Sequence, residues 1–412
     1  MSKHFDTLET REPALRELAL LAALPAQVVH AKTHTSAYAT LLANVDPRGI
    51  TSRAALEQLP VVRKSSLLEL QKANRPFGGF AATTWGAASL VFASPGPIYE
   101  PESRAPDYWR MARALFAAGF RAGDLIHNCF SYHFTPGGAM LESGALALGC
   151  TVFRGGTGQT EQQVQTMAEL APRGYVGTPS FLKIILDKAD ELGVALRSVT
   201  KALVSGEAFP ASLRSSFAAR GITAYQAYAT ADVGSIAYES PARDGLIVDE
   251  GVLVEIVRPG TGKAVAEGEV GEVVVTLLYN RDYPLIRFGT GDLSAALPGP
   301  SPCGRTNMRI KGWLGRADQT AKVRGMFVHP SQVAAIAARH PEIARAKLIV
   351  DNAEGSDRMT LHVEVAANAS SNADAIIASI RDVTKLRGEI AFHGVGELAN
   401  DGKVIEDVRT LD

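Results

Sequence analysis

The strongest constraint on the fold is a regular alternation of strand-like and helix-like segments between residues 149 and 220. Short β-rich runs are followed by glycine or proline and then by apolar residues at helical spacing. Such alternation is typical of an α/β fold with a largely parallel sheet. The predicted segments are a strand at Thr151–Phe153, a helix at Glu161–Leu170, a helix capped by Thr178 and ended by Gly193, a strand at Lys201–Ser205 and a helix at Ala211–Arg220.

The pattern changes twice further along the chain. From Gly245 the sequence is β-rich with little helix, and after Pro330 it alternates as a compact α+β module. A chain of 412 residues exceeds one typical domain. We therefore expect an α/β fold with a large N-terminal domain at 1–316, made of parallel-sheet layers and a β-rich subdomain, and a small α+β C-terminal domain at 317–412.

The N-terminal region and the composition bear on location and partners. A helix is predicted at Leu15–Leu24 and is expected to stop at Pro25. The apolar run Ala19–Val29 is too short to span a bilayer, and residues 1–11 do not form a signal peptide. Net charge is −1, and the 3 cysteines form no C-x-x-C pair. These features predict a soluble, cytoplasmic protein that binds neither nucleic acid nor membrane.

Six motifs occur in order along most of the chain. They are GGTGQTE (Gly155–Glu161), GTPSFL (Gly177–Leu182), SGEAFP (Ser205–Pro210), PLIRFGTGDL (Pro284–Leu293), IKGWLGRADQTAKVRGMFVHPSQV (Ile310–Val333) and DGKVIEDV (Asp401–Val408). In order and spacing they resemble the phenylacetate–CoA ligase family of adenylate-forming enzymes. The resemblance covers roughly residue 50 to the end and implies that family's fold, with a mobile C-terminal lid.

The resemblance also implies cofactors and residue roles. ATP, Mg²⁺ and coenzyme A would be used with a small aromatic acid, and a homodimer is expected. Lys403 and Asp232 would be catalytic, Asp232 would hold Mg²⁺, and Asp318 would be the hinge of the C-terminal domain. The nucleotide would be bound by Gly206, Glu207, Ala208, Tyr228, Ala229, Asp292 and Arg316.

Each of these residues has a second interpretation. Asp292 follows a strand and a glycine, so it is either a ribose ligand or an ordinary turn residue. Tyr228 stacks on adenine or belongs to the core. Arg287 is equally well explained as a structural ion pair or as a phosphate contact. Lys403 is either a mobile charge for the α-phosphate or a surface lysine.

The phosphate loop departs from the family pattern. Where the family has Ser-Ser-Gly-Thr-Thr-Gly-Lys-Pro, this chain reads SPGPIYEP at Ser94–Pro101. Pro95 and Pro97 lack backbone N–H donors, and Tyr99 replaces a glycine. Glu100 replaces the lysine and is expected to place a negative charge where phosphate binds.

Two further departures concern metals. Ala231 lacks the hydroxyl that the family carries beside the acid at Asp232. Some members hold a structural zinc, but the equivalent positions here are Ser240, Ile247, Ser301 and Cys303, and one thiolate does not make a tetrahedral site. We expect no zinc.

The acid pocket is expected in the segment His127–Gly138 and after Gly177. A flat aromatic acid would contact Phe130, Tyr132, His133 and Phe181, with His133 donating to the carboxylate. The other interpretation is that these aromatic residues, and a hydrogen-bonded His133, belong to the core.

Three functions remain open at this point. The first is activation of an aryl or arylacetic acid by ATP followed by transfer to coenzyme A. The second is a non-catalytic or regulatory protein that binds a nucleotide or acyl-CoA, as the altered phosphate loop suggests. The third is an adenylating enzyme that passes its acyl group to a carrier protein. The acid itself is not identified by the sequence.

Overall fold

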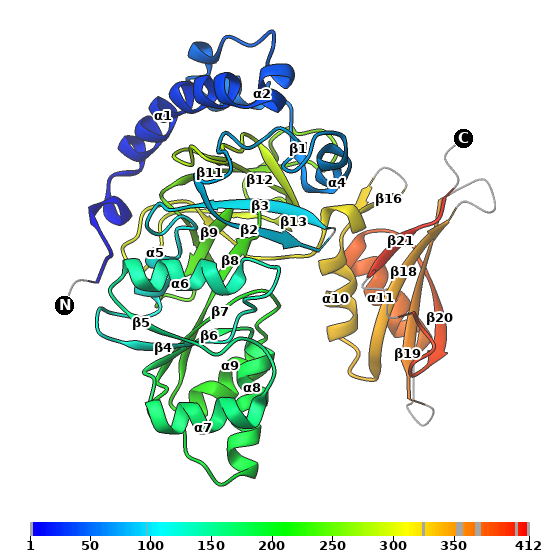
Figure 1. Cartoon of the computed structure of the whole chain (residues 1–412). Helices are drawn as coiled ribbons and strands as arrows, with labels where there is room; N and C mark the ends of the chain where they lie inside the picture. Colours follow the sequence, from blue (N-terminus) through cyan, green and yellow to red (C-terminus); the bar gives the residue numbers. More distant parts are fainter. Residues whose placement is uncertain are drawn as a thin grey trace. The chain divides into compact units, whose positions relative to one another are not determined.

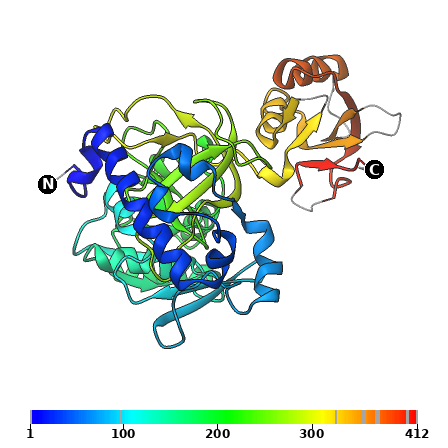
Figure 2. The same cartoon turned by 90° about the horizontal axis from the view of Figure 1, so that it is seen from above.

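The computed structural model describes residues 3–95, 97–323, 326–351, 357–366, 372–399 and 403–409. The chain divides into two compact units, which can be followed by colour in Figures 1 and 2. Unit 1 comprises Met1–Thr290 and Ser294–Trp313, and unit 2 comprises Gly291–Leu293 and Leu314–Asp412. Asp292 therefore belongs to unit 2 together with Gly291 and Leu293, whereas the residues on either side of these three belong to unit 1.

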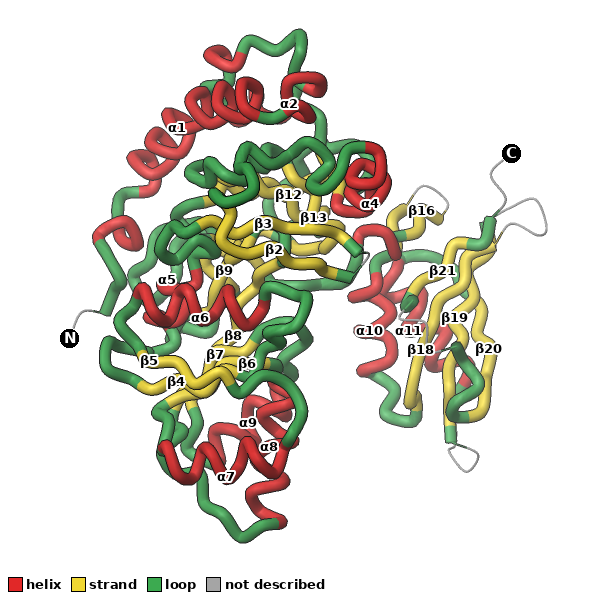
Figure 3. Tube along the Cα trace, in the orientation of Figure 1, coloured by secondary structure: helices red, strands yellow, loops and turns green. Residues whose placement is uncertain are grey.

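A mixed sheet, with nine strands among the described residues, forms the centre of unit 1 (Figure 3). In sheet order the strands are β14 (Ala296–Leu297), β15 (Arg309–Ile310), β10 (Leu246–Val248), β9 (Gly234–Glu239), β8 (Thr223–Thr230), β7 (Lys201–Val204), β6 (Gly174–Gly177), β4 (Leu125–Asn128) and β5 (Thr151–Arg154). Strands β5, β4, β6, β7 and β8 pair in parallel, and the remaining pairs are antiparallel. The predicted parallel α/β sheet is confirmed.

Helices cover both faces of the parallel strands (Figure 3). They are α5 (Met111–Ala117), α6 (Gly137–Ala147), α7 (Thr160–Leu170), α8 (Pro179–Glu191) and α9 (Ala211–Ala219). Val176 and Leu203 pack with α5 and α6, whereas their strand neighbours Tyr175 and Ala202 pack with α7, α8 and α9. Because successive strand residues point to opposite faces, both faces of the sheet are apolar and both need helices.

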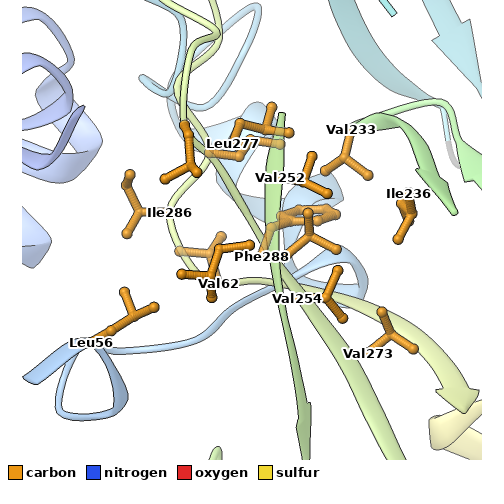
Figure 4. Packing of buried hydrophobic residues seen from close by; sticks show 14 of the residues in the cluster. Leu56, Val62, Val233, Ile236, Val252, Val254, Val273, Leu277, Ile286 and Phe288 are labelled. Atoms are coloured by element: carbon orange, nitrogen blue, oxygen red, sulfur yellow. The ribbon is translucent and has the colours of Figure 1, made fainter. Parts of the chain in front are cut away.

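The β-rich part of unit 1 is a second, smaller sheet. Its strands, in order, are β1 (Val62–Arg63), β13 (Phe288–Ser294), β12 (Gly271–Leu277) and β11 (Val252–Val257). Val62, Val254, Val273 and Phe288 lie together in its core (Figure 4). The predicted strands at Val252–Val257 and Glu272–Leu278 are thereby confirmed to within one residue.

The first helix is longer than the sequence indicates. Helix α1 (Pro13–His34) continues through Pro25, where we expected it to end. Leu20, Leu24 and Val28 lie on one helical face and are buried in the core of unit 1, so packing offsets the backbone hydrogen bond that proline lacks. An 18-residue stretch of α1 has a mean hydropathy of 1.2, long and apolar enough by these two criteria to cross a membrane. Core helices of water-soluble proteins meet the same criteria.

Buried ion pairs attach the N-terminal segment to residues that lie far along the chain. Arg305 contacts Glu9 at 2.9 Å, with side chains 2% and 0% exposed, and Tyr238 donates a hydrogen bond to the same carboxylate. Arg16 of α1 contacts Glu250 at 3.0 Å. The other short elements of this region are η1 (Thr7–Thr10), α2 (Ser36–Leu41), η2 (Pro47–Gly49), α3 (Arg53–Glu57) and α4 (Lys64–Ala73).

Unit 2 is an α+β module. Its main sheet has the order β20 (Glu389–Gly394), β19 (Arg358–Val365), β18 (Ile343–Asp351) and β21 (Ile405–Asp407) among the described residues. The remaining elements are η3 (Ala317–Gln319), the hairpin β16 (Ala321–Val323) and β17 (Met326–Val328), and helices α10 (Pro330–Ala338) and α11 (Ala373–Thr384). Val333, Leu348, Leu361 and Ile376 form its core. The turn predicted at Asn352–Asp357 lies almost wholly outside the described residues.

Candidate functional site

A cavity of about 630 Å³ opens in unit 1 where four strands of the large sheet end. Cys129 follows β4, Thr178 follows β6, Ser205 follows β7 and Ala231 follows β8, and all four line the cavity. In α/β sheets, ligands bind outside the carboxyl ends of the parallel strands. The position of this cavity is therefore that of a substrate site.

One part of the cavity wall is apolar. Met111 at the start of α5, Met140 and Leu141 in α6, and the aromatic rings of Phe130 and Phe181 contribute to it. Met111, Met140 and Leu141 are at most 5% exposed and belong to the core that joins α5 and α6 to the sheet. A wall of thioether, aliphatic and aromatic groups is suited to a flat apolar ring.

The expected acid pocket is only partly on this wall. Phe130 and Phe181 line the cavity, but Tyr132 and His133 are not among its described lining residues. Tyr132 donates its hydroxyl hydrogen bond to Glu142 at 2.9 Å, and His133 is exposed. The structure therefore places His133 in solvent, contrary to our expectation.

The most polar feature beside the cavity is a buried ion pair. Lys64 Nζ, at the start of α4, lies 2.5 Å from Asp232 Oδ2. The Asp232 side chain is 0% exposed and that of Lys64 is 21% exposed, and Lys64 lines the cavity. Asp232 Oδ1 is buried and has no hydrogen-bond partner among the described residues.

Sequence reasoning missed Lys64. It lies 168 residues before Asp232, in a stretch whose only local signals are a short strand followed by a helix. Met111 and Met140 also line the cavity without having been predicted to do so, whereas Ser94 and Thr178 fall in the stretches expected to form the phosphate loop and the acid pocket. The usable signal was the position of Thr178 between a strand and a helix, because such residues meet at one edge of a parallel sheet.

The altered phosphate loop is a β-hairpin. Strands β2 (Ala88–Ser94) and β3 (Ile98–Ser103) pair antiparallel with Ser94 opposite Ile98, and Ser94 and Pro95 line the cavity. Glu100 does not line it, because its side chain is folded inward and is 0% exposed. Burial, reinforced by the negative charge of Asp232, raises the pKa of Glu100 to about 8. Our expectation of a negative charge facing the phosphates is wrong for this reason.

Five of the expected nucleotide-binding residues lie in unit 1. Gly206, Glu207 and Ala208 form the exposed loop after β7, where Gly206 has a φ of 86° and lines the cavity. Ala229 lines the cavity as well. Tyr228 is 8% exposed, lies in the core and has its hydroxyl 3.3 Å from Thr290 Oγ1. No contact in the structure tests their binding roles.

The remaining expected residues lie in unit 2. Asp292 is 9% exposed, and its carboxylate lies 3.4 Å from Arg316 Nη1. Asp318 lies in η3, and its side chain is outside the described part of the chain. Lys403 is half-exposed and lies 3.1 Å from Glu406. These arrangements leave the roles of all four residues as predictions.

Arg287 has a structural role. Its guanidinium donates two hydrogen bonds to the Glu255 carboxylate, each of 3.0 Å, and others to the carbonyls of Glu57, Leu59 and Gly262. The side chain is 1% exposed. Of the two interpretations that the sequence left open, the structure supports the ion pair.

The region compared with the zinc motif holds a thiol among hydroxyl groups. Cys303 Sγ lies 3.1 Å from Ser301 Oγ and 3.5 Å from Arg305 Nη1. Hydrogen bonds from Ser240, Ser301 and Arg305 lower the pKa of this thiol, although its burial opposes them. Across the described ranges no group of three or more His, Cys, Asp or Glu residues is arranged to hold a metal.

A second cavity, of about 640 Å³, lies elsewhere in unit 1. Val254, Ile256, Val265 and Leu297 contribute to its lining. It does not lie at the ends of the parallel strands and lacks the pair formed by Lys64 and Asp232. The cavity at the strand ends is therefore the better candidate for the site.

The chain is similar to known enzymes over most of its length. A family model described as "AMP-binding enzyme" matches residues 107–276. The phenylacetate-coenzyme A ligase of Aromatoleum evansii is 32% identical over 341 residues, which cover 79% of this chain and 76% of that enzyme. The phenylacetate-coenzyme A ligase of Thermus thermophilus is 32% identical over 340 residues, covering 78% and 75%. That of Escherichia coli is 32% identical over 306 residues, covering 71% and 68%.

Solved structures support the fold. An open conformation of 2-hydroxyisobutyryl-CoA ligase, in complex with 2-HIB-AMP and CoA, matches with a TM-score of 0.86 at 23% identity, covering 98% of this chain and 95% of that one. An amide bond synthetase from Marinactinospora thermotolerans matches with a TM-score of 0.56 at 17% identity, covering 78% and 68%. At these identities the likeness concerns the arrangement of the elements.

Proposed function

The chain belongs to the phenylacetate–coenzyme A ligase family, and we propose that it activates an aromatic carboxylic acid with ATP and transfers the acyl group to coenzyme A. The observation that carries this proposal is the composition of one cavity. It combines the ammonium group of Lys64, paired with Asp232, with the aromatic rings of Phe130 and Phe181. The ring of an aryl or arylacetic acid needs the apolar wall, and the phosphates of ATP need the cation.

In the first half-reaction, a carboxylate oxygen of the acid attacks the α-phosphorus of ATP. The bond from that phosphorus to the bridging oxygen breaks, and pyrophosphate leaves with the electron pair. The apolar wall would hold the acid ring and thereby orient its carboxylate. Lys64 would stabilise the negative charge that develops on the phosphate oxygens, and such a preorganised cation is most effective in a partly desolvated site.

Asp232 would also hold Mg²⁺. Its Oδ1 atom is a buried oxygen without a partner in the described part of the chain, and Mg²⁺ in nucleotide sites is bound by one or two carboxylates together with substrate phosphates. The ion would neutralise part of the charge on the departing pyrophosphate. We propose no zinc site.

The other residues implied by the resemblance take supporting roles. Gly206, Glu207, Ala208, Tyr228 and Ala229 would surround the adenine, and Asp292 and Arg316 would contact the ribose and phosphates.

The second half-reaction would use the small domain, 317–412, turning at Asp318. In the first half-reaction Lys403 of this domain would approach the α-phosphate. After the turn, the thiol sulfur of coenzyme A would attack the acyl carbon, and AMP would leave. A cytoplasmic homodimer is the form we propose, since the six motifs all belong to this family.

Pyrophosphate exchange tests the proposal. Labelled pyrophosphate should enter ATP only when a matching acid from a panel of aryl and arylacetic acids is present, and added coenzyme A should then yield AMP and a thioester detectable by mass spectrometry. An acyl-adenylate that forms but reacts only with a carrier protein would redirect the second step. Absence of exchange with every acid, together with measurable binding of AMP or acyl-CoA, would refute the ligase and favour a binding protein.

A further inference from the structure

The β2–β3 hairpin lies beside the cavity, and hydrogen bonds within the hairpin hold its Ser94 end. Ser94 and Pro95 line the cavity, and Pro97 continues the turn. The Ser94 backbone N–H donates to Glu100 Oε2 at 3.3 Å. Both groups are buried, Ser94 at 4% and Glu100 at 0% exposure. The carboxyl group thus bonds the end of the neighbouring strand instead of facing the cavity.

The contacts of the Ser94 hydroxyl indicate whether the Glu100 carboxyl group is protonated. Its oxygen makes a very short contact with Glu100 Oε1 and lies 3.5 Å from the Ile98 carbonyl. A hydroxyl has one proton to donate, and an ionised carboxylate and a carbonyl both only accept. If Glu100 carries a proton and donates it to Ser94 Oγ, the hydroxyl can donate to Ile98 and both contacts are satisfied.

The surrounding charges favour the same state. Asp232 and Glu100 are two buried carboxyl groups, and Lys64 is the cation that interacts with both. The Tyr283 hydroxyl, which also faces this pair, has its pKa raised well above the ordinary value, mainly by burial. Glu102, two residues along β3, is turned to Trp109 at 2.9 Å. With Lys64 paired to Asp232, a second buried negative charge would have no partner.

We propose that Glu100 is a positioning residue of the proposed ligase. In its neutral form it fixes Ser94 and the hairpin end beside the cavity, and it does not compete with Asp232 for the ammonium group of Lys64. The β- and γ-phosphates then meet a fixed wall that carries no negative charge. Lys64, from another element, supplies the cation that the loop itself lacks. This inference rests on the proposed function for its kinetic test but not for its binding test.

Three variants and two nucleotides test the role. Glu100→Gln resembles the neutral carboxyl group and can keep both bonds to Ser94, whereas Glu100→Ala removes them. The matched control is Glu102→Ala, which loses a buried hydrogen bond on the same strand without touching Ser94. The dissociation constants of ATP and AMP are measured by calorimetry at pH 7 with and without Mg²⁺. AMP lacks the phosphates that reach the hairpin, so it reports on general damage to the site.

Glu100→Ala is expected to weaken ATP binding about tenfold or more while AMP binding changes less than threefold. Glu100→Gln should restore the ratio of the two dissociation constants to within about threefold of the parent, and Glu102→Ala should leave that ratio unchanged. A Glu100→Gln protein that binds ATP tenfold more tightly would overturn the proposal, because it would show that Glu100 repels the phosphates. Equal losses for ATP and AMP in Glu100→Ala would also overturn it.

A kinetic test separates this inference from the proposed function. With any acid that supports exchange, Glu100→Ala should raise KM for ATP at least tenfold, change KM for the acid less than threefold, and be rescued by Glu100→Gln. If no acid supports exchange but the binding ratios follow the expected pattern, the ligase proposal fails and the role of Glu100 stands. If neither nucleotide binds to the parent protein, both fail.

Discussion

Two of the buried pairs of a cation and a carboxylate in unit 1 differ in how far their hydrogen bonds are satisfied. The Arg287 guanidinium bonds to both oxygens of Glu255 and to three backbone carbonyls, and its side chain is 1% exposed. Lys64 bonds to one oxygen of Asp232, whose other oxygen has no partner in the described chain, and the pair lies at the cavity.

This difference distinguishes an ion pair that stabilises the fold from one that can bind a charged substrate. A buried ion pair whose donors are all satisfied has nothing left to offer a ligand, and its loss is felt as instability. A pair with unsatisfied atoms beside a cavity can still bind a charged substrate. Its loss should therefore weaken substrate binding and lower the reaction rate. Each of the following predictions can break or sharpen this distinction.

The largest effect is expected for Arg287→Ala. This change leaves Glu255 as a buried carboxylate without its partner, so the free energy of unfolding should fall by about 3–5 kcal/mol. Urea denaturation followed by circular dichroism measures it. Arg287→Lys keeps the charge but not the paired geometry and should lose less. A change below about 1 kcal/mol in the alanine variant would contradict the structural role.

Next in size is the effect of Lys64→Met on catalysis. Removing the cation should lower the rate of pyrophosphate exchange by about 10²–10³, as loss of a preorganised charge-stabilising group does. The free energy of unfolding should also fall, because Asp232 loses its partner, but by less than in Arg287→Ala, because the Lys64 side chain is 21% exposed at the cavity. Lys72→Met is the control, since Lys72 lies on the same helix and pairs with exposed Glu69. An unchanged rate of pyrophosphate exchange in Lys64→Met would contradict the catalytic role of Lys64.

Glu100 is a third buried carboxyl group. Its protonation should make the free energy of unfolding of the protein depend on pH. Its folded-state pKa of about 8 lies above the ordinary value of 4.5, so the folded protein binds the extra proton between these values. Its contribution to stability is therefore complete below pH 4.5 and is lost as pH rises towards 8.

The parent protein should lose on the order of 2 kcal/mol more than Glu100→Gln between pH 5 and 8, measured by urea denaturation with a chelator present. Parallel curves for the two proteins would show that Glu100 is ionised throughout.

The smallest effect is expected at the apolar wall. Phe181→Ala should raise KM for the acid about tenfold, the loss typical of one apolar contact surface, with KM for ATP almost unchanged. Phe134→Ala provides the matched control, because Phe134 is 82% exposed and should affect neither constant. If KM for ATP rose as much as KM for the acid, the wall would not be specific for the acid.

Much of the fold follows from the sequence, because local signals and sheet topology agree. Thr178 and Pro179 begin α8 as predicted, and β11 has the bounds expected from its β-branched residues. The exception is α1, where the tertiary contacts of Leu24 and Val28 override the stop signal of Pro25.

The site was less accessible to sequence reasoning. Phe130, Phe181, Gly206 and Ala229 were predicted as site residues from the family resemblance, and all four line the cavity. Lys64 could not be found, because its approach to Asp232 depends on packing between elements far apart in the chain. The side chain of Glu100 could not be oriented either, because a motif gives a residue's position in the chain but not which way a hairpin turns it.

The ion pairs of the N-terminal segment have a consequence for the order in which the protein is completed. Glu9 and Arg16 are made first, but their partners Arg305 and Glu250 emerge from the ribosome some 300 and 230 residues later. Until then neither of these two pairs can form, although α1 already has α2 and η2 to pack against. The pair of Arg16 therefore has to wait for Glu250 and the pair of Glu9 for Arg305, so synthesis that stops before Glu250 yields a chain in which neither pair can form.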